Sequence, residues 1–406
     1  MVDRKAFLGK VRPFIGTDVV KVVTGMRRCG KSVFLEQIKD EIRRTKGADA
    51  KIISVSLEDD ENQKFLAKGV LHQFVNDQLQ AEPGQMHYVF LDEIHDVEEW
   101  ERCVNSLRLR KNVDIYVTGS NSKLLSGELA TYLTGRYIEI KMTPFSFCEF
   151  KEAASVAFPD DEGERLFWRY LDCGGVPFLT KIAYDATASK DYLRDLYGAI
   201  LLKDVVRRKN IRDVDLLDRL VRYVLNETGH TFSARKISDF FKHEQRIVAP
   251  ETILNYLGAC EEAFLLARVK RQDLVGKRIL AVDEKFYVTD LGLRRAVIGG
   301  SIARDMDVAL ENVVYAELVR RGYEVTIGRV REKEVDFVCD KDGRRLFVQV
   351  AYLMATEEVR AREYGALDAV KARGEKLLLT LDRLDLSTET ISHRYLPDWL
   401  VAEDVV

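Results

Sequence analysis

The sequence predicts an α/β protein whose first domain is a parallel sheet covered by helices on both faces. Three observations indicate this fold. A glycine-rich turn at residues 25–32 joins an apolar strand to a helical segment. Two further runs, 88–93 and 114–121, are apolar strands that end in polar residues. Such runs are typical of strands buried on both faces, and a ligand of such a sheet lies beyond the carboxyl ends of its strands.

Composition sets the frame for this prediction. The chain has 406 residues, enough for two or three domains, and its 46% hydrophobic and 32% charged residues are typical of a soluble globular protein. No run of 18 apolar residues predicts a membrane span. The first residues, MVDRKAFLGKVRPFIG, lack the apolar core of a secretion signal. We therefore expect a cytoplasmic protein with no membrane partner.

The net charge and the cysteine and histidine spacing argue against a chain that binds nucleic acid over its whole surface and against a zinc site. The net charge of −3 argues against a chain that binds nucleic acid over its whole surface, although a local basic patch is compatible with it. The six cysteines form no C-x-x-C pair, and the six histidines show no zinc spacing. We expect reduced thiols.

The first element is a phosphate-binding loop. Residues 25–32 read GMRRCGKS and fit the pattern G-x-x-x-x-G-K-[ST] in full, between the strand around Val22 and a helix at 33–44. Backbone N–H groups and the helix N-terminus would face the phosphates of ATP. Lys31 would reach the β- and γ-phosphates, and Ser32 would hold Mg²⁺. The residues expected to bind nucleotide are Gly25, Arg28, Cys29, Gly30, Lys31, Ser32 and Val33.

Cys29 has two interpretations. Its place near a helix N-terminus would lower the pKa of its thiol. The alternative, an ordinary small residue at a free position of the pattern, is favoured.

An acidic pair follows the strand at 88–91. Asp92 would hold Mg²⁺ through water, and Glu93 would act as the general base that polarises the attacking water. A merely solvated strand end is the alternative. The complete phosphate loop upstream favours the catalytic interpretation.

The next strand ends in Gly119-Ser120-Asn121. In P-loop ATPases of the additional-strand type, a strand between the P-loop strand and the acidic strand ends in a polar residue that senses the γ-phosphate. Ser120 and Asn121 suit this role, with Asn121 as the assigned sensor, although the same residues suit a simple turn. Arg136, before a strand at 137–140, is a candidate arginine finger in cis or toward a neighbouring copy. A surface arginine paired with a carboxylate is an equal alternative.

The middle of the chain is helical. Residues 162–200 predict a small helical lid, interrupted at Gly174-Gly175 and Pro177. Three helices (216–225, 234–241, 251–264) and a hairpin (265–270, 278–288) then predict a winged helix. Its third helix offers only Asn255 to base edges, which disfavours sequence readout. The hairpin 268–278 could contact DNA phosphates through Arg268, Lys270, Arg271, Lys277 and Arg278. A winged helix that docks a protein partner is at least as well supported.

The C-terminal region follows the order helix (308–320), strands (323–327, 334–338, 346–350), helix (358–372), strand (376–381). This order resembles the core of the restriction-endonuclease-like nucleases. Glu311 and Asp336 match two metal-binding positions of that group, but Gln349-Val350-Ala351 stands where Glu-x-Lys is expected. We therefore predict a nuclease-like domain that does not cut nucleic acid.

The chain also resembles a known family over nearly its whole length. The runs TGMRRCGKS, VFLDEIHDVEEW, VTGSNSKLL, LTGR, TPFSFCEF, CGGVPF, LLKDVVRR, LENVVYAEL and KEVDFV are similar to prokaryotic AAA-type ATPases with an uncharacterised C-terminal domain. The resemblance implies nucleotide or catalytic roles for Lys31, Ser32, Asp92 and Glu93. It makes Arg136 more plausible as a finger, and it supplies no substrate.

Together these features predict an ATPase domain (1–160), a lid (161–212), a winged helix (213–300) and a nuclease-like domain (301–406). The expected function is MgATP hydrolysis that drives a conformational change of a C-terminal half, which binds nucleic acid or protein. A nucleotide-gated scaffold with little turnover is the alternative, and an ATP-driven nuclease is the least favoured. A finger used in trans would require a homo-oligomer.

Overall fold

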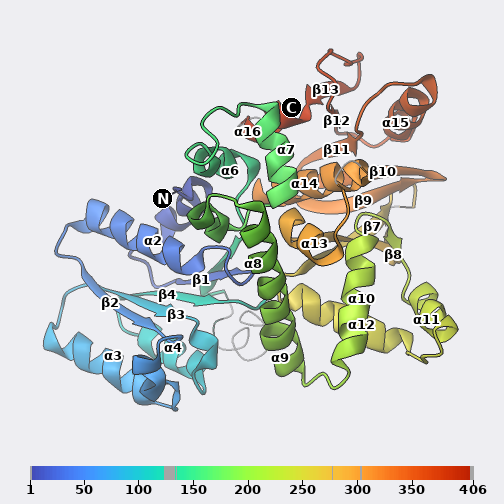
Figure 1. Cartoon of the computed structure of the whole chain (residues 1–406). Coiled ribbons are helices and arrows are strands. Elements are labelled where there is room, and N and C mark those ends of the chain that lie inside the picture. Colours follow the sequence, from blue (N-terminus) through green and yellow to red (C-terminus); the bar gives the residue numbers. More distant parts are fainter. Residues whose placement is uncertain (1, 123–132, 134, 277, 302–303, 403–406) are drawn as a thin grey trace. The chain divides into compact units, whose positions relative to one another are not determined.

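The computed structural model describes residues 2–122, 133, 135–276, 278–301 and 304–402 (Figure 1). The chain divides into two compact units. The first consists of Met1–Pro144 with Glu262–Phe264, and the second of Phe145–Glu261 with Leu265–Val406. Among the described residues, no helix is long and apolar enough to cross a membrane.

The first unit is built on a five-stranded parallel sheet in the order β2-β3-β4-β1-β5. The predicted α/β fold class is thus confirmed. The strands are β1 (Val20–Gly25), β2 (Lys51–Ser56), β3 (His87–Asp92), β4 (Val113–Gly119) and β5 (Tyr137–Met142). Since β4 lies between β1 and β3, it is the additional strand that the sequence predicted.

Helices cover this sheet on both faces (Figure 1). They are α1 (Lys5–Val11), α2 (Lys31–Lys46), α3 (Val70–Ala81) and α4 (Trp100–Arg108). Val75 of α3 and Val104 of α4 join a buried apolar cluster that includes Leu91 of β3. Phe7 of α1 packs edge-to-face on Phe34 of α2, with ring centroids 6.1 Å apart. The apolar strands therefore have a covered face on each side, as their composition requires.

A buried ion pair lies where the strands of this sheet begin. Lys21 of β1 and Asp114 of β4 are both 0% exposed, and their charged atoms are 2.5 Å apart. Tyr116 Oη and Gly16 N also donate hydrogen bonds to Asp114 Oδ2, at 2.9 and 2.7 Å. Burial raises the pKa of Asp114 and lowers that of Lys21, and their mutual attraction opposes both shifts. The sequence predicted apolar strands in these two regions and did not predict the ion pair.

The second unit contains an eight-stranded sheet in the order β13-β12-β11-β10-β9-β7-β8-β6. Its strands are β6 (Thr231–Phe232), β7 (Leu266–Asp273), β8 (Arg278–Val288), β9 (Glu324–Val330), β10 (Lys333–Lys341), β11 (Arg344–Val350), β12 (Glu375–Thr380) and β13 (Ser392–Tyr395). The predicted hairpin and the three predicted strands of the C-terminal region are all present within a few residues of their expected bounds.

The helices of this part of the chain also follow the predicted order. They are α6 (Phe147–Ala154), α7 (Glu164–Cys173), α8 (Ala186–Ala199), a π-helical turn (Ile200–Val206), α9 (Arg207–Lys209), α10 (Val214–Asn226), α11 (Ala234–His243), α12 (Pro250–Glu262), α13 (Leu291–Ile298), α14 (Met306–Arg320), α15 (Glu357–Ala369) and α16 (Leu396–Val401).

The hairpin and the C-terminal strands share one sheet, which the sequence did not predict. Strand β7 pairs in parallel with β9, with Arg271 opposite Ile327 and Gln272 opposite Gly328. The described contacts also place α6 in the second unit, whereas the sequence predicted an ATPase domain that extends to residue 160. The division of the second unit into lid, winged helix and nuclease-like domain remains a prediction.

The CGGVPF segment is held by the N-cap of α13. Asp290 is buried and accepts hydrogen bonds from Gly175 N at 2.7 Å and Leu293 N at 2.8 Å. A Cβ at Gly174 would lie 2.3 Å from Asp290 Oδ1. Only glycine therefore permits this close approach, which explains the glycine pair in the motif.

Candidate functional site

The phosphate-binding loop connects β1 to α2. A Cβ on Gly25 would lie 2.4 Å from Met142 O, so only glycine fits the approach of the loop to β5. Gly30, with φ of 101°, turns the chain into α2. In the described part of the chain, no side chain caps α2 and its first turn carries no acidic residue. Its first N–H groups are thus available to an anion, as the sequence predicted.

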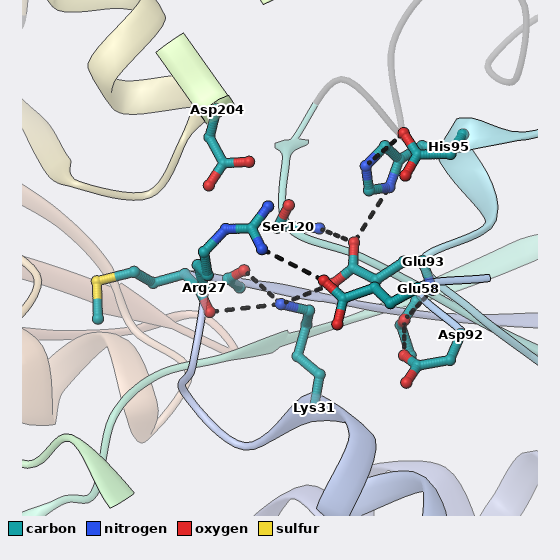
Figure 2. A network of polar contacts seen from close by, with 12 residues as sticks. Arg27, Lys31, Glu58, Asp92, Glu93, His95, Ser120 and Asp204 are labelled. Atoms are coloured by element: carbon teal, nitrogen blue, oxygen red, sulfur yellow. Dashed lines mark hydrogen bonds and ion pairs between the residues drawn. The ribbon is translucent and has the colours of Figure 1, made fainter. Parts of the chain in front are cut away.

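Lys31 links this loop to the acidic strand (Figure 2). Its Nζ donates to Gly25 O at 3.2 Å and Met26 O at 3.4 Å, and it lies 3.3 Å from Glu93 Oε1. The side chain is 5% exposed. The lysine that the motif assigns to phosphate therefore contacts the carboxylate assigned as the general base.

Asp92 and Glu93 stand at the carboxyl end of β3, next to β4. Glu93 has φ of 56°, in the left-handed region, which turns its carboxylate toward the loop. The hydroxyl of Thr118 accepts a hydrogen bond from Glu93 N at 2.8 Å and donates one to Asp92 Oδ1. Thr118 itself is 0% exposed. One hydroxyl of β4 therefore fixes both members of the acidic pair.

The carboxylate of Glu93 has two further contacts on its second oxygen. Ser120 N donates to Glu93 Oε2 at 3.2 Å, and His95 Nδ1 lies 3.2 Å from the same atom (Figure 2). His95 Nε2 lies 3.5 Å from Asp96 Oδ1. Lys31 thus contacts one oxygen of Glu93, while His95 and the backbone amide of Ser120 contact the other.

The other predicted nucleotide-binding residues surround the loop. Ser32, Val33 and Arg28 are exposed, as an approach by nucleotide requires. Asn121, the assigned sensor, is 3% exposed and directly follows Ser120. The structure does not test its contact with a γ-phosphate, so its role stays a prediction.

Cys29 is buried in the loop rather than activated. Burial raises the pKa of its thiol, against the attraction of Lys31 and Arg4. The disfavoured interpretation, a lowered pKa of this thiol, is therefore wrong. The favoured alternative, a small residue at a free position, describes Cys29 better.

Arg136 lies at the amino-terminal ends of the strands, whereas the loop lies at their carboxyl-terminal ends. Its carbonyl accepts from Val20 N at 2.9 Å, where β1 and β5 begin, whereas the loop follows the end of β1. The six residues of β1 separate the two ends of this strand by about 20 Å at ~3.3 Å per residue. An arginine side chain cannot span that distance. The sheet thus excludes a finger in cis, and a role toward a neighbouring copy stays a prediction.

The motif patterns do not single out Thr118, His95 or the pair formed by Arg27 and Glu58. Arg27 of the loop donates to Glu58 Oε1 at 3.3 Å, just after β2 (Figure 2). The signal for Thr118 and His95 was their spacing from assigned residues, two positions before Ser120 and two after Glu93. Alternate strand residues point to opposite faces, so a one-dimensional pattern did not show which would meet.

The side chains present fit Mg²⁺ and ATP. Lys31 and the uncapped N-terminus of α2 supply positive charge for phosphates, and Ser32 and Asp92 supply the oxygen ligands that Mg²⁺ prefers.

A second polar cluster lies in the second unit, at the predicted nuclease-like positions. Lys285 Nζ of β8 is 2.7 Å from Glu334 Oε1 and 3.3 Å from Glu311 Oε2. Burial alone would lower the pKa of Lys285, but attraction to Glu311, Asp336 and Glu334 outweighs it and raises the pKa. In the described part of the chain, no group of three or more His, Cys, Asp or Glu side chains is arranged to hold a metal ion.

The basic hairpin is largely neutralised by the protein itself. Arg268 lies 3.2 Å from Glu261 and 3.6 Å from Glu284, and Arg271 is 8% exposed and 3.8 Å from Glu334. Lys270 is exposed. Lys277 lies outside the described residues, as does the side chain of Arg278. Internal pairing leaves less charge for DNA than the sequence predicted.

Comparison with known proteins matches two parts of the chain to families. Residues 17–151 match a family described as an AAA domain, and residues 164–302 match a domain of unknown function (DUF8612). The first match covers the loop, the acidic pair and β5. It supports a P-loop AAA-type ATPase domain, while the second match does not bear on a winged helix or a nuclease-like fold.

Two proteins are similar over most of the chain. An uncharacterized protein of Haemophilus influenzae is 34% identical over 402 residues, which is 99% of each chain. An uncharacterized protein of Methanocaldococcus jannaschii is 29% identical over 388 residues, covering 91% of this chain and 82% of the other.

Solved structures give weaker similarity. A Signal Transduction ATPase with Numerous Domains from Pyrococcus horikoshii is 13% identical, with a TM-score of 0.32, and covers 79% of this chain and 47% of that one. Rhizobiales Trip13 is 13% identical, with a TM-score of 0.28, and covers 39% of this chain and 58% of that one.

Proposed function

This chain belongs to the family of the Haemophilus influenzae protein that it matches from end to end, and we propose that it is an ATPase that hydrolyses MgATP. The observation that carries the proposal is the meeting of Lys31 with Glu93 beside Asp92, at the carboxyl ends of β1 and β3. A loop lysine, a metal-binding carboxylate and a carboxylate base are the groups that phosphoryl transfer to water requires.

Each residue has a distinct role in this proposal. Lys31 and the N–H groups of the loop residues Gly25, Arg28, Cys29, Gly30, Ser32 and Val33 bind the phosphates. Ser32 and Asp92 would hold Mg²⁺, which when bound would supply positive charge beside the phosphates. Glu93 orients the attacking water and accepts its proton. Asn121 senses the γ-phosphate.

The contact between Lys31 and Glu93 links binding to activation. The two side chains neutralise each other at 3.3 Å while both are buried. A phosphate attracts Lys31 away from Glu93, because it carries more negative charge than one carboxylate. Glu93 then keeps its contacts with Ser120 N and His95 on the second oxygen, and its first oxygen becomes free to accept a proton.

The second unit is the part that ATP turnover would act upon. We propose that it binds a protein partner. The observation that favours protein over DNA is the internal pairing of Arg268 and Arg271 with carboxylates. Contact with phosphates would require these pairs to break, which reduces the electrostatic gain of DNA binding.

Steady-state hydrolysis of ATP tests the site. We expect Glu93→Gln to lower turnover by about 10²–10⁴-fold while nucleotide still binds, because a neutral amide cannot accept the proton of water. We expect Lys31→Ala to lower both binding and turnover. Glu98→Gln, five residues along the chain and exposed, is the matched control. Turnover unchanged in either site variant would reject the assignment.

The same assay separates the candidate partners. DNA is added at low and high salt to the wild type and to Lys270→Ala. Stimulation by DNA that salt and Lys270→Ala both remove would overturn the protein-partner proposal in favour of DNA. Slow turnover that is indifferent to DNA is the expected result. Tight ATP binding without turnover would favour the nucleotide-gated scaffold.

A further inference from the structure

We propose that Thr118 is a positioning residue that orients both the Mg²⁺ ligand Asp92 and the general base Glu93. This inference rests on the proposed function. The carrying observation is a single hydroxyl that donates to Asp92 Oδ1 and accepts from Glu93 N at 2.8 Å. Nothing in the motif patterns assigns Thr118, which lies on β4 rather than on the acidic strand.

The bond to Asp92 determines which oxygen is left for the metal. A hydroxyl has one proton to donate, and here it points to Oδ1. Rotation of the carboxylate about its side chain is thereby restricted, and Oδ2 remains for Mg²⁺ or its water. Hydrogen bonds that orient a ligand in this way typically change metal affinity or activity by about 10–100-fold when removed.

The bond from Glu93 N stabilises an unfavourable backbone conformation. Glu93 has φ of 56°, a left-handed conformation that is unfavourable for a residue with a Cβ. Without Thr118, this buried N–H would lose its acceptor. The left-handed turn is what brings the Glu93 carboxylate to Lys31 and to Ser120 N. Thr118 therefore sets the direction of the base through the main chain.

Packing alone does not require a hydroxyl at this position. Thr118 is 0% exposed in a sheet whose neighbouring buried residues include Val23, Val117 and Leu91. Burying a hydroxyl is unfavourable unless it is hydrogen-bonded, and valine has nearly the same shape. Packing of the side chain alone would thus be satisfied as well by valine. The hydroxyl is used for the two bonds at the acidic pair.

The test compares Thr118→Val, which removes the hydroxyl at constant shape, with Thr118→Ser, which keeps it. Binding of a fluorescent ATP analogue is measured in EDTA and across a Mg²⁺ titration, and turnover is measured alongside. We expect Thr118→Val to need about 10–100-fold more Mg²⁺ for the metal-dependent tightening of binding, and to lose about the same factor in kcat. Affinity in EDTA should not change, and Thr118→Ser should stay close to the wild type.

Controls separate this role from loss of fold. Thr228→Val removes a buried hydroxyl bonded to the Leu225 carbonyl in the second unit, and should change neither Mg²⁺ dependence nor turnover. If Thr118→Val fails to fold, Thr118→Ala carries the same expectation. A hydroxyl-free variant with wild-type Mg²⁺ dependence and kcat would overturn the inference. The inference would also be overturned if Thr118→Val and Thr118→Ser both bound the ATP analogue more weakly in EDTA.

Failure of the proposed function would look different. A wild type that binds MgATP without turnover would reject hydrolysis, while the Mg²⁺ titration would still decide the role of Thr118. A wild type that binds no nucleotide would reject the function and the Mg²⁺ site together.

Discussion

At the scale of single residues, the site depends on how the two oxygens of Glu93 are shared. Lys31 contacts one oxygen, while His95 and Ser120 N contact the other. The histidine is the only one of the three that belongs to neither the phosphate loop nor the sensor strand. It lies two residues beyond Glu93 and also contacts Asp96.

His95 should therefore affect the chemical step more than nucleotide binding. We expect His95→Ala to lower kcat by about tenfold, equivalent to ~1.4 kcal/mol, because Glu93 loses a polar contact at 3.2 Å, with nucleotide affinity nearly unchanged. His95→Gln, which retains a donor, should lose less. Steady-state kinetics at saturating ATP measure this. His72→Ala, whose ring contacts Ser106 instead, is the control. A rise in KM at constant kcat would contradict the assignment.

At the scale of elements, Asp290 joins two segments of the second unit. Its carboxylate caps α13 and accepts from Gly175 N at 2.7 Å. Burial raises the pKa of Asp290 from 3.8 to about 6, against the hydrogen bonds from these backbone groups. The folded protein therefore holds a proton here that the unfolded chain has already lost between about pH 4 and 6.

This difference predicts how stability depends on pH. A raised pKa in the folded state gives stability that is complete below pH 3.8 and is lost as pH rises through 6. Between pH 5 and 7 the loss is about 1 kcal/mol. We expect the urea midpoint of the wild type to fall relative to Asp290→Asn over this range. Asp185→Asn, at the exposed N-cap of α8, measures the effect of replacing a capping carboxylate by an amide where the cap is not buried. An opposite slope would contradict the raised pKa.

At the scale of the whole molecule, the sheet of the second unit crosses the predicted boundary at residue 301. Strand β9 pairs with β7, and Lys285 and Tyr287 of β8 contact Glu311 of α14. These contacts join the predicted winged helix to the predicted nuclease-like domain. Asp336, which faces the same charges, is buried and its pKa is raised by burial first and by Glu311 second.

Fragments test whether these parts fold together. We expect residues 145–406 to unfold cooperatively, because they contain the complete sheet. We expect residues 301–406 to be unfolded or aggregated, since they would leave Glu311 without Lys285 and expose the β9 edge. Breaking a buried ion pair by removing one partner costs about 3–5 kcal/mol, a large part of the ~5–15 kcal/mol of a domain. Thermal melts monitored by circular dichroism would show this. A cooperative melt of 301–406 would support the boundary predicted from sequence.

Local patterns determined much of this protein. The apolar runs and the glycine-rich turn predicted the strands, the helices and their order, because strand burial and loop conformation depend on nearby residues. The pattern of residues 25–32 likewise placed Lys31 just before the helix that follows the loop. The apolar run at 88–91 placed the acidic pair at the end of β3. These features depend on the periodicity of apolar residues and on the backbone freedom of glycine, and both can be read directly from the sequence.

Only the tertiary structure decided which distant side chains meet. It brought Thr118 to Asp92 and Glu93 and paired Arg271 with Glu334. It also placed Arg136 at the end of the sheet where the strands begin, away from the loop. Each of these depends on strand register and order, and pairing between strands far apart in the chain leaves no periodic trace in the sequence. The sequence alone therefore determined the parts of the site that are contiguous, and the fold decided the contacts that hold them in place.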